Sequence, residues 1–228
     1  MGNVNHASST SGPLQIKICG LTRVDEALGC ADLGSDAIGL VFYSKSPRYI
    51  NMPKAKEICL ALPDKIKTVG VFVDETFSNI MRIALYCGLK GVQLHGNESF
   101  FLVDQLVKEN LIVIKTLFSG RKPHIDDAFN YRASAFLVEC GKGALPGGNA
   151  EIWNWKESRK LSNTLPLVLA GGLSSENIAE AVRSGLPDAV DISSGVESSP
   201  GRKDLRKVAS FIKKASGCSV QQTVKKIF

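Results

Sequence analysis

Residues 167–192 read LVLAGGLSSENIAEAVRSGLPDAVDI and contain one complete structural unit. The apolar runs 167–170 and 189–192 have the length and composition of buried strands, and 175–184 between them has the spacing of an amphipathic helix. Parallel strands need such a crossover connection, which is usually a helix. The stretch therefore predicts a strand, a helix and a second, parallel strand.

The same alternation extends toward the N-terminus of the chain. Six more apolar runs, each bounded by Gly, Pro or Asn, are expected to form strands at 14–19, 37–42, 68–73, 91–94, 111–115 and 135–139. Segments with helical periodicity lie at 25–33, 53–62, 77–86, 100–109, 125–129, 152–160, 175–184 and 203–215, of which 125–129 is short and weak. Eight units in 228 residues favour a single-domain α/β fold, the (β/α)8 TIM barrel. An open doubly wound sheet is the competing fold, but no GxGxxG follows the first run.

Local signals mark helix ends. A side chain that accepts a backbone hydrogen bond, followed by carboxylates or proline, is typical of a helix start, and glycine is typical of a helix end. The expected helix starts are Thr22, Asn51, and Ser174 or Ser175. The expected helix ends are Gly34 and Gly88.

Composition and the ends of the chain set the domain organisation. With 44% hydrophobic and 22% charged residues the chain resembles an average globular protein, and no apolar run reaches the ~18 residues of a membrane span. We expect a disordered extension at 1–13, one barrel at 14–217 and a tail at 218–228. Val220, Val224 and Phe228 of the tail either cover an apolar patch or fray. A cytoplasmic location is expected.

Charge and cysteine content narrow the partners. The net charge of +6 comes from dispersed Lys and Arg without a recognisable nucleic-acid motif, so we expect an anionic small molecule and no nucleic acid or membrane. The six cysteines form no CxxC pair and no Cys/His cluster, so neither a disulfide framework nor a metal site is expected.

Two glycine-containing loops follow the last two expected strands. They are LAGGLSS at 169–175 and VDISSGV at 190–196. Glycine lets backbone N–H groups approach an anion, and barrels often place a phosphate at the loops after strands seven and eight. A tight turn is the alternative for one such loop, but two on consecutive strands indicate a phosphate site.

Four polar side chains end other strands or follow them. Cys19 is either a small buried residue or, with Lys17 nearby, a partly ionised thiol. Glu139 is either a structural ion-pair partner or an acid that faces Cys19 across the mouth. Arg48 is either a surface residue or a bidentate hydrogen-bond donor to a substrate carboxylate. His95 is more simply a hydrogen-bonded residue that lines the site than a proton carrier.

An ordered series of motifs links these positions. They are KICGLT at 17–22, GLVFY at 39–43, SPRY at 46–49, VGVFV at 69–73, VQLHG at 92–96, AGGL at 170–173, VDISSGVE at 190–197 and PGRKD at 200–204. In this series the sequence resembles the phosphoribosylanthranilate isomerase family of tryptophan biosynthesis, over about 16–214.

The resemblance implies a compact β/α barrel that acts as an intramolecular aldose-ketose isomerase without metal or organic cofactor. It implies an Amadori rearrangement of N-(5-phosphoribosyl)anthranilate with Cys19 as general base and a carboxylic acid, here Glu139, as general acid. It further implies a carboxylate-binding Arg48 and lining or ordering roles for His95 and Asp191. The phosphate-binding positions that it implies are Gly171, Gly172, Ser194 and Gly195. We expect a monomer or a homodimer.

The sequence departs from the family pattern near the acid. The family has Asp where this chain has Glu139, and the glycine-rich run after it is here Gly147-Gly-Asn-Ala150, followed by Glu151. The alternative function is therefore a catalytically weakened or repurposed barrel that binds the same phosphorylated ligand. A third hypothesis is a neighbouring phosphate-binding barrel, such as a synthase of the same pathway or a sugar-phosphate epimerase. The epimerase needs metal ligands that three histidines, at 6, 95 and 124, cannot supply.

Overall fold

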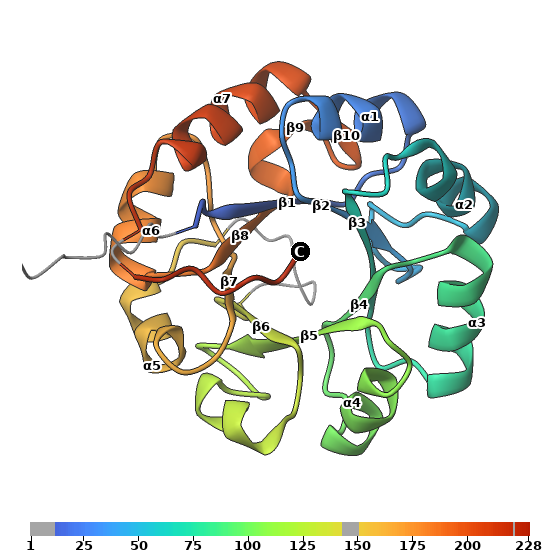
Figure 1. The fold of residues 1–228 in the computed structure, drawn as a ribbon, viewed down its shortest axis with the longest axis horizontal. Helices are drawn as coiled ribbons and strands as arrows, with labels where there is room; N and C mark the ends of the chain where they lie inside the picture. The colour runs from blue at the N-terminus through green and yellow to red at the C-terminus, as the bar shows by residue number, and fades with distance from the viewer. Residues whose placement is uncertain (1–11, 143–150, 221) are drawn as a thin grey trace, which may run out of the picture.

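The structure, a computed structural model, describes residues 12–142, 151–220 and 222–228. Eight parallel strands pair in chain order and the first pairs with the last, so the sheet closes into a barrel (Figure 1). The strands are β1 (Gln15–Cys19), β2 (Ala37–Val41), β3 (Lys67–Phe72), β4 (Gly91–Leu94), β5 (Ile112–Phe118), β6 (Ala135–Glu139), β7 (Leu167–Leu169) and β8 (Ala189–Ile192). The predicted (β/α)8 barrel is confirmed.

Helices surround the barrel on its outside (Figure 1). The α-helices are α1 (Val24–Asp32), α2 (Met52–Ala61), α3 (Phe77–Cys87), α4 (Phe100–Val107), α5 (Arg159–Ser162), α6 (Ile178–Gly185) and α7 (Leu205–Ser216), and the 3-10 helices are η1 (Ile125–Asn130), η2 (Trp155–Ser158) and η3 (Ser194–Val196). The segment expected to be weak, 125–129, is thus a 3-10 helix. Across the described residues, no helix combines the length and the apolar character that a bilayer span requires.

A small hairpin after β8 has no counterpart in the sequence prediction. Its strands are β9 (Glu197–Ser199) and β10 (Arg202–Lys203), which pair antiparallel. Both are polar and only two or three residues long, so they lack the apolar run by which the barrel strands are recognised.

Three of the expected helix signals act as predicted. The Asn51 side chain accepts a hydrogen bond from the backbone N–H of Lys54 at the start of α2. Gly88 ends α3 in the left-handed conformation, with φ 72°. Gly34, with φ 103°, follows the last residues of α1.

The other two expected caps are wrong. The N-cap of α1 is Arg23, and the Thr22 hydroxyl donates instead to the carbonyl of Gly201, 2.8 Å away. α6 begins later than expected, at Ile178, because Ser174 accepts from Glu176 in a turn that precedes the helix. In the first case a contact with the hairpin loop replaces the local cap.

Strand β1 shows how the barrel interior is arranged. Ile16 and Ile18 belong to the apolar layer that the helices cover. Gln15, Lys17 and Cys19, at the alternate positions, are buried on the opposite face of the strand, which is the inside of the barrel. Cys19 therefore lies at the C-terminal end of the barrel, Lys17 one layer below it, and Gln15 at the N-terminal end.

The C-terminal tail closes the N-terminal end of the barrel. Figure 1 shows the C-terminus inside the ring of strands, and Ile227 and Phe228 pack in one cluster with interior residues of the barrel. The Gln15 side chain accepts from the backbone N–H groups of both residues at 2.8 Å and donates to the carbonyl of Lys225 at 2.8 Å. Val220 is also buried. The tail thus covers apolar surface, while residues 1–11 of the expected extension lie outside the described residues.

We predict that the tail contributes measurably to stability. Phe228→Ala should lower the free energy of unfolding by about 2 to 3 kcal/mol, because it exposes a buried aromatic ring and opens the end of the barrel. Urea unfolding followed by circular dichroism checks this. Lys226→Ala, which removes an exposed side chain of the same tail, is the matched control and should unfold like the parent chain. Equal midpoints for all three proteins would contradict the prediction.

Candidate active site

A pocket opens at the C-terminal ends of the strands. It lies among the loops that follow the strands, the place where barrels of this kind bind small molecules. All nine side chains or glycines expected to form the site line it: Cys19, Arg48, His95, Glu139, Gly171, Gly172, Asp191, Ser194 and Gly195. The structure therefore brings together residues that are up to 176 positions apart, while their roles remain predictions.

Barrel closure fixes the order of these residues around the rim. β6, β7, β8 and β1 are consecutive neighbours in the closed sheet. Glu139 ends β6 and Cys19 ends β1, so the loops after β7 and β8 lie between them. Arg48 comes from the loop after β2, the other neighbour of β1, and its side chain reaches the segment after β8, where it meets Glu197.

Cys19 is accompanied by a buried ion pair. The Lys17 ammonium lies 3.0 Å from Asp191 Oδ1, and the two residues are register partners across β1 and β8. Burial raises the pKa of the Cys19 thiol, although the charge of Lys17 opposes this effect. The direction of this shift is opposite to the partly ionised thiol expected from the sequence.

Glu139 is held by a histidine. Its Oε1 lies 3.2 Å from His95 Nε2, while Gln93 Nε2 lies 2.8 Å from His95 Nδ1. With the amide nitrogen of Gln93 donating, Nδ1 accepts and the ring proton on Nε2 points to Glu139. Phe118 packs edge-on against the imidazole, at 5.7 Å between ring centres. This geometry supports the expectation that His95 is a wall residue, and it adds that His95 orients the carboxyl group.

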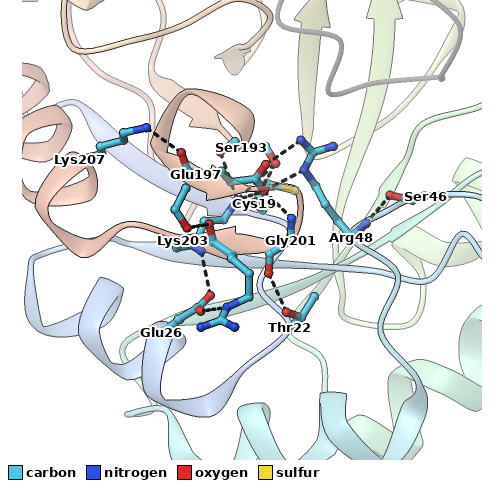
Figure 2. A network of polar contacts seen from close by, with 12 residues as sticks. Cys19, Thr22, Glu26, Ser46, Arg48, Ser193, Glu197, Gly201, Lys203 and Lys207 are labelled. Atoms are coloured by element: carbon cyan, nitrogen blue, oxygen red, sulfur yellow. Dashed lines mark hydrogen bonds and ion pairs between the residues drawn. The ribbon is translucent and has the colours of Figure 1, made fainter.

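The guanidinium of Arg48 is anchored by a partner that the sequence prediction missed. Nε and Nη2 of Arg48 donate to the two carboxylate oxygens of Glu197 at 2.9 and 2.8 Å, and both side chains are buried (Figure 2). Two of the three guanidinium nitrogens are therefore already engaged inside the protein. Glu197 belongs to the quoted motif VDISSGVE, but nothing in the motif distinguished it from a surface carboxylate.

Glu197 also binds Lys203, which joins the hairpin to the site. Lys203 Nζ lies 2.8 Å from Glu197 Oε1 and 3.1 Å from the carbonyl of Ser193, while its backbone N–H donates to Glu26 (Figure 2). Burial acts to raise the pKa of Glu197, but hydrogen bonds and charges from Arg48 and Lys203 outweigh it and hold the pKa below its usual value. The carboxylate is thus ionised and shared between two cations.

The loop after β7 is shaped by glycines and two tryptophans. Gly171 and Gly172 have φ of 84° and 67°, which side chains other than glycine rarely adopt. A Cβ on Gly172 would also lie 2.8 Å from the backbone carbonyl carbon and oxygen of Glu151. Trp153 and Trp155 donate from Nε1 to the carbonyls of Ala170 and Gly171 at 2.9 and 3.2 Å. The turn is therefore fixed in a form that keeps backbone, not side chains, facing the pocket.

The run Gly147-Gly-Asn-Ala150 lies outside the described residues, whereas Glu151 is exposed at the pocket rim. Among the described residues, no three His, Cys, Asp or Glu side chains gather as a group that could hold a metal ion.

Comparison with known proteins adds independent information. Residues 16–214 match the family model described as N-(5'phosphoribosyl)anthranilate (PRA) isomerase. The N-(5'-phosphoribosyl)anthranilate isomerase of Desulfatibacillum aliphaticivorans is 49% identical over 215 residues, which cover 94% of this chain and 99% of that relative. The enzyme of the same name from Thermotoga neapolitana is 42% identical over 205 residues, covering 90% and 99%.

Solved structures agree. The phosphoribosyl anthranilate isomerase of Thermotoga maritima superposes with a TM-score of 0.82 at 38% identity, covering 90% of this chain and 99% of that chain. A structure of a phosphoribosyl anthranilate isomerase in complex with reduced 1-(o-carboxyphenylamino)-1-deoxyribulose 5-phosphate has a TM-score of 0.79, also at 38% identity and with the same coverage. The match spans the whole length of these neighbours.

The contacts of Glu197 with Arg48 and Lys203 should affect stability in a way that depends on pH. Glu197→Gln should lower the free energy of unfolding at pH 7 by about 3 kcal/mol, because Arg48 and Lys203 lose a buried counter-charge. A carboxylate whose folded pKa is depressed stabilises above its unfolded pKa and loses that contribution as pH falls through the folded value. The difference between parent and variant should therefore shrink below about pH 4.

Urea unfolding at a series of pH values, as far down as the fold persists, measures this difference. Glu57→Gln, which neutralises an exposed glutamate, is the matched control and should show no pH-dependent difference of this kind. A Glu197→Gln variant as stable as its parent at pH 7 would be incompatible with the prediction.

Proposed function

This chain belongs to the N-(5'-phosphoribosyl)anthranilate isomerase family, whose members are isomerases of tryptophan biosynthesis, and from this premise we propose how its own residues carry out the reaction. Cys19 is the general base and Glu139 the general acid of an Amadori rearrangement. The reaction converts N-(5-phosphoribosyl)anthranilate to 1-(2-carboxyphenylamino)-1-deoxyribulose 5-phosphate. The observation that carries this proposal is that a thiol and a carboxyl group line the same pocket, with two glycine loops between them.

The phosphate is proposed to bind at the loops after β7 and β8, through Gly171, Gly172, Ser194 and Gly195. These residues line the pocket between the strands that carry the acid and the base. Backbone N–H groups in a glycine turn bind an anion without a charged side chain nearby. A phosphate held there directs the sugar toward both Glu139 and Cys19.

Glu139 is proposed to start the reaction. Its carboxyl group protonates the ribose ring oxygen, the bond from that oxygen to C1 breaks, and the nitrogen lone pair forms the Schiff base. His95 holds Oε1 of Glu139 at 3.2 Å, which limits the freedom of a side chain one methylene longer than Asp. A fixed carboxyl matters because a misplacement of about 1 Å can reduce a rate about a hundredfold.

Cys19 is proposed to complete the rearrangement. Its thiolate takes the proton from C2, the C–H electron pair forms the C1–C2 double bond, and the electrons of the imine double bond return to nitrogen. The resulting enolamine tautomerises to the ketone. The steps are proton transfers and bond shifts without net oxidation, so they consume no oxidant or reductant.

Arg48 is proposed to recognise the carboxylate of the anthranilate ring. Nε and Nη2 bind Glu197, which leaves Nη1 to donate to the ligand. Asp191 orders the site through Lys17.

A cytoplasmic location and a monomeric or homodimeric state complete the proposal. The Thermotoga maritima enzyme is described as dimeric.

The second candidate function is a barrel that binds the same ligand but turns it over weakly. It is favoured by Glu139 in place of the family's Asp and by an exposed Glu151 at the rim. Binding of a reduced product analogue by calorimetry, together with no measurable turnover by the folded parent chain, would support it over an active isomerase.

The test of the proposed function is loss of turnover in two variants. Cys19→Ser and Glu139→Gln should each lower kcat by about 10²- to 10⁴-fold, because each removes a proton carrier. The fluorescence of N-(5-phosphoribosyl)anthranilate, followed as it disappears, measures the rate. Cys218→Ser and Glu57→Gln, which change the same residue types away from the pocket, are matched controls. Parent-like rates in Cys19→Ser or Glu139→Gln would remove that residue from the mechanism.

A conservative variant tests whether a carboxyl group at position 139 is what the reaction requires. Glu139→Asp should keep or raise kcat, because it retains the carboxyl group and matches the residue of the family. The same fluorescence assay, run beside Glu139→Gln, gives the comparison. A Glu139→Asp variant as inactive as Glu139→Gln would show that the carboxyl group alone does not carry the proton.

A further inference from the structure

The ion pair beneath the pocket has no evident structural purpose. Lys17 is fully buried, and barrel interiors are usually filled by branched aliphatic side chains. Replacing a buried ion pair by apolar residues of similar volume is often neutral or stabilising, so stability does not explain a lysine at this position. Asp191 compensates its charge at 3.0 Å, which keeps the ammonium protonated in spite of burial.

The ammonium of Lys17 lies next to the sulfur of Cys19. The two residues are at alternate positions of β1 and therefore face the same side of the strand. A Cβ on Gly39, across the β1–β2 pair, would lie 2.6 Å from Cys19 Sγ and 3.0 Å from Lys17 Nζ, so both atoms border the same small space. The charge of Lys17 opposes the effect of burial on the pKa of the thiol.

Among the charged side chains near the sulfur, Lys17 acts on it most strongly. The charged side chains that act most on Cys19 are Lys17 from β1, Asp191 from β8 and Lys203 from β10. Lys203 is paired with Glu197, and Asp191 is paired with Lys17 itself. Burial raises the pKa of the thiol, and Lys17 is the strongest opposing group.

We propose that Lys17 is a positioning residue of the isomerase, whose ammonium, fixed by Asp191, stabilises the thiolate of Cys19. This inference rests on the proposed function of Cys19 as the base. Lys17 keeps its proton throughout. When Cys19 takes the C2 proton, the S–H bond forms, the C–H bond breaks, and the negative charge beside Lys17 passes to the substrate, where it neutralises the iminium nitrogen.

The test measures the Cys19 thiolate directly, without turnover. Alkylation by iodoacetamide is followed over pH, with the Cys19 peptide quantified by mass spectrometry, because only the thiolate reacts. In Lys17→Met the midpoint for Cys19 should move upward by about one to three pH units, the effect expected from loss of a neighbouring opposite charge. Lys17→Arg, which keeps the charge, should restore at least part of the shift. The half-buried Cys218 serves as the internal control.

Two further variants separate an electrostatic role from a structural one. Lys115→Met removes an equally buried lysine, paired with Glu98 on another part of the barrel, and should leave the Cys19 midpoint unchanged. Lys17→Met with Asp191→Asn leaves no unpaired charge and should still shift the midpoint upward, but by less than Lys17→Met. This double variant provides the comparison if the single variant does not fold.

The outcomes distinguish this inference from the proposed function. Unchanged Cys19 midpoints in the folded Lys17→Met or double variant would overturn the role of Lys17. A shifted midpoint together with parent-like turnover by Cys19→Ser would uphold the influence of Lys17 on the thiol and reject Cys19 as the base. If Lys17 stabilises the thiolate and Cys19 is the base, kcat of Lys17→Met at pH 7 should fall about tenfold or more and should recover as pH rises.

Discussion

The pairing of β1 with β8 is the constraint on which the rest of the structure depends. It joins segments 174 residues apart and places Lys17 beside Asp191 inside the barrel. Once the sheet is closed, every strand must offer alternate side chains to one shared interior, and the polar residues at the strand ends converge on one pocket. The site is therefore a consequence of closure, and no single β/α unit could form it.

Closure also brings the carboxylate of Glu197, which lies outside the pocket lining, into contact with Arg48, which lines it. Arg48 and Lys203 both lie in a buried environment, where an unpaired cation is costly. Glu197 contacts both, so it fixes their positions and balances part of their charge (Figure 2). The hairpin that carries Glu197 and Lys203 is tied to α1 by Glu26, which couples this charge balance to the outer helix layer.

The sequence predicts the barrel well because its strands are apolar runs that pack on both faces. Seven of the eight barrel strands agree with the expected ranges to within one residue at each end, and β5 extends three residues beyond the expected 111–115. Predictions fail where a tertiary contact replaces a local one, as when Thr22 contacts Gly201 instead of capping α1. The pairing of Arg48 with Glu197 could not be predicted, because it depends on how two loops 149 positions apart meet in space.

The side chains of β1 that face the barrel interior, Gln15, Lys17 and Cys19, lie at successive depths between its two ends. Gln15 has both its amide groups engaged by backbone at the closed end, so it fixes the tail that seals the interior. Lys17 in the middle layer is separated from water at that end and held by Asp191. An ammonium in such a place interacts with neighbouring charges more strongly than it would in water, because the surroundings screen it weakly. The tail at one end of β1 thus preserves the dry environment in which Lys17 acts on Cys19 at the other.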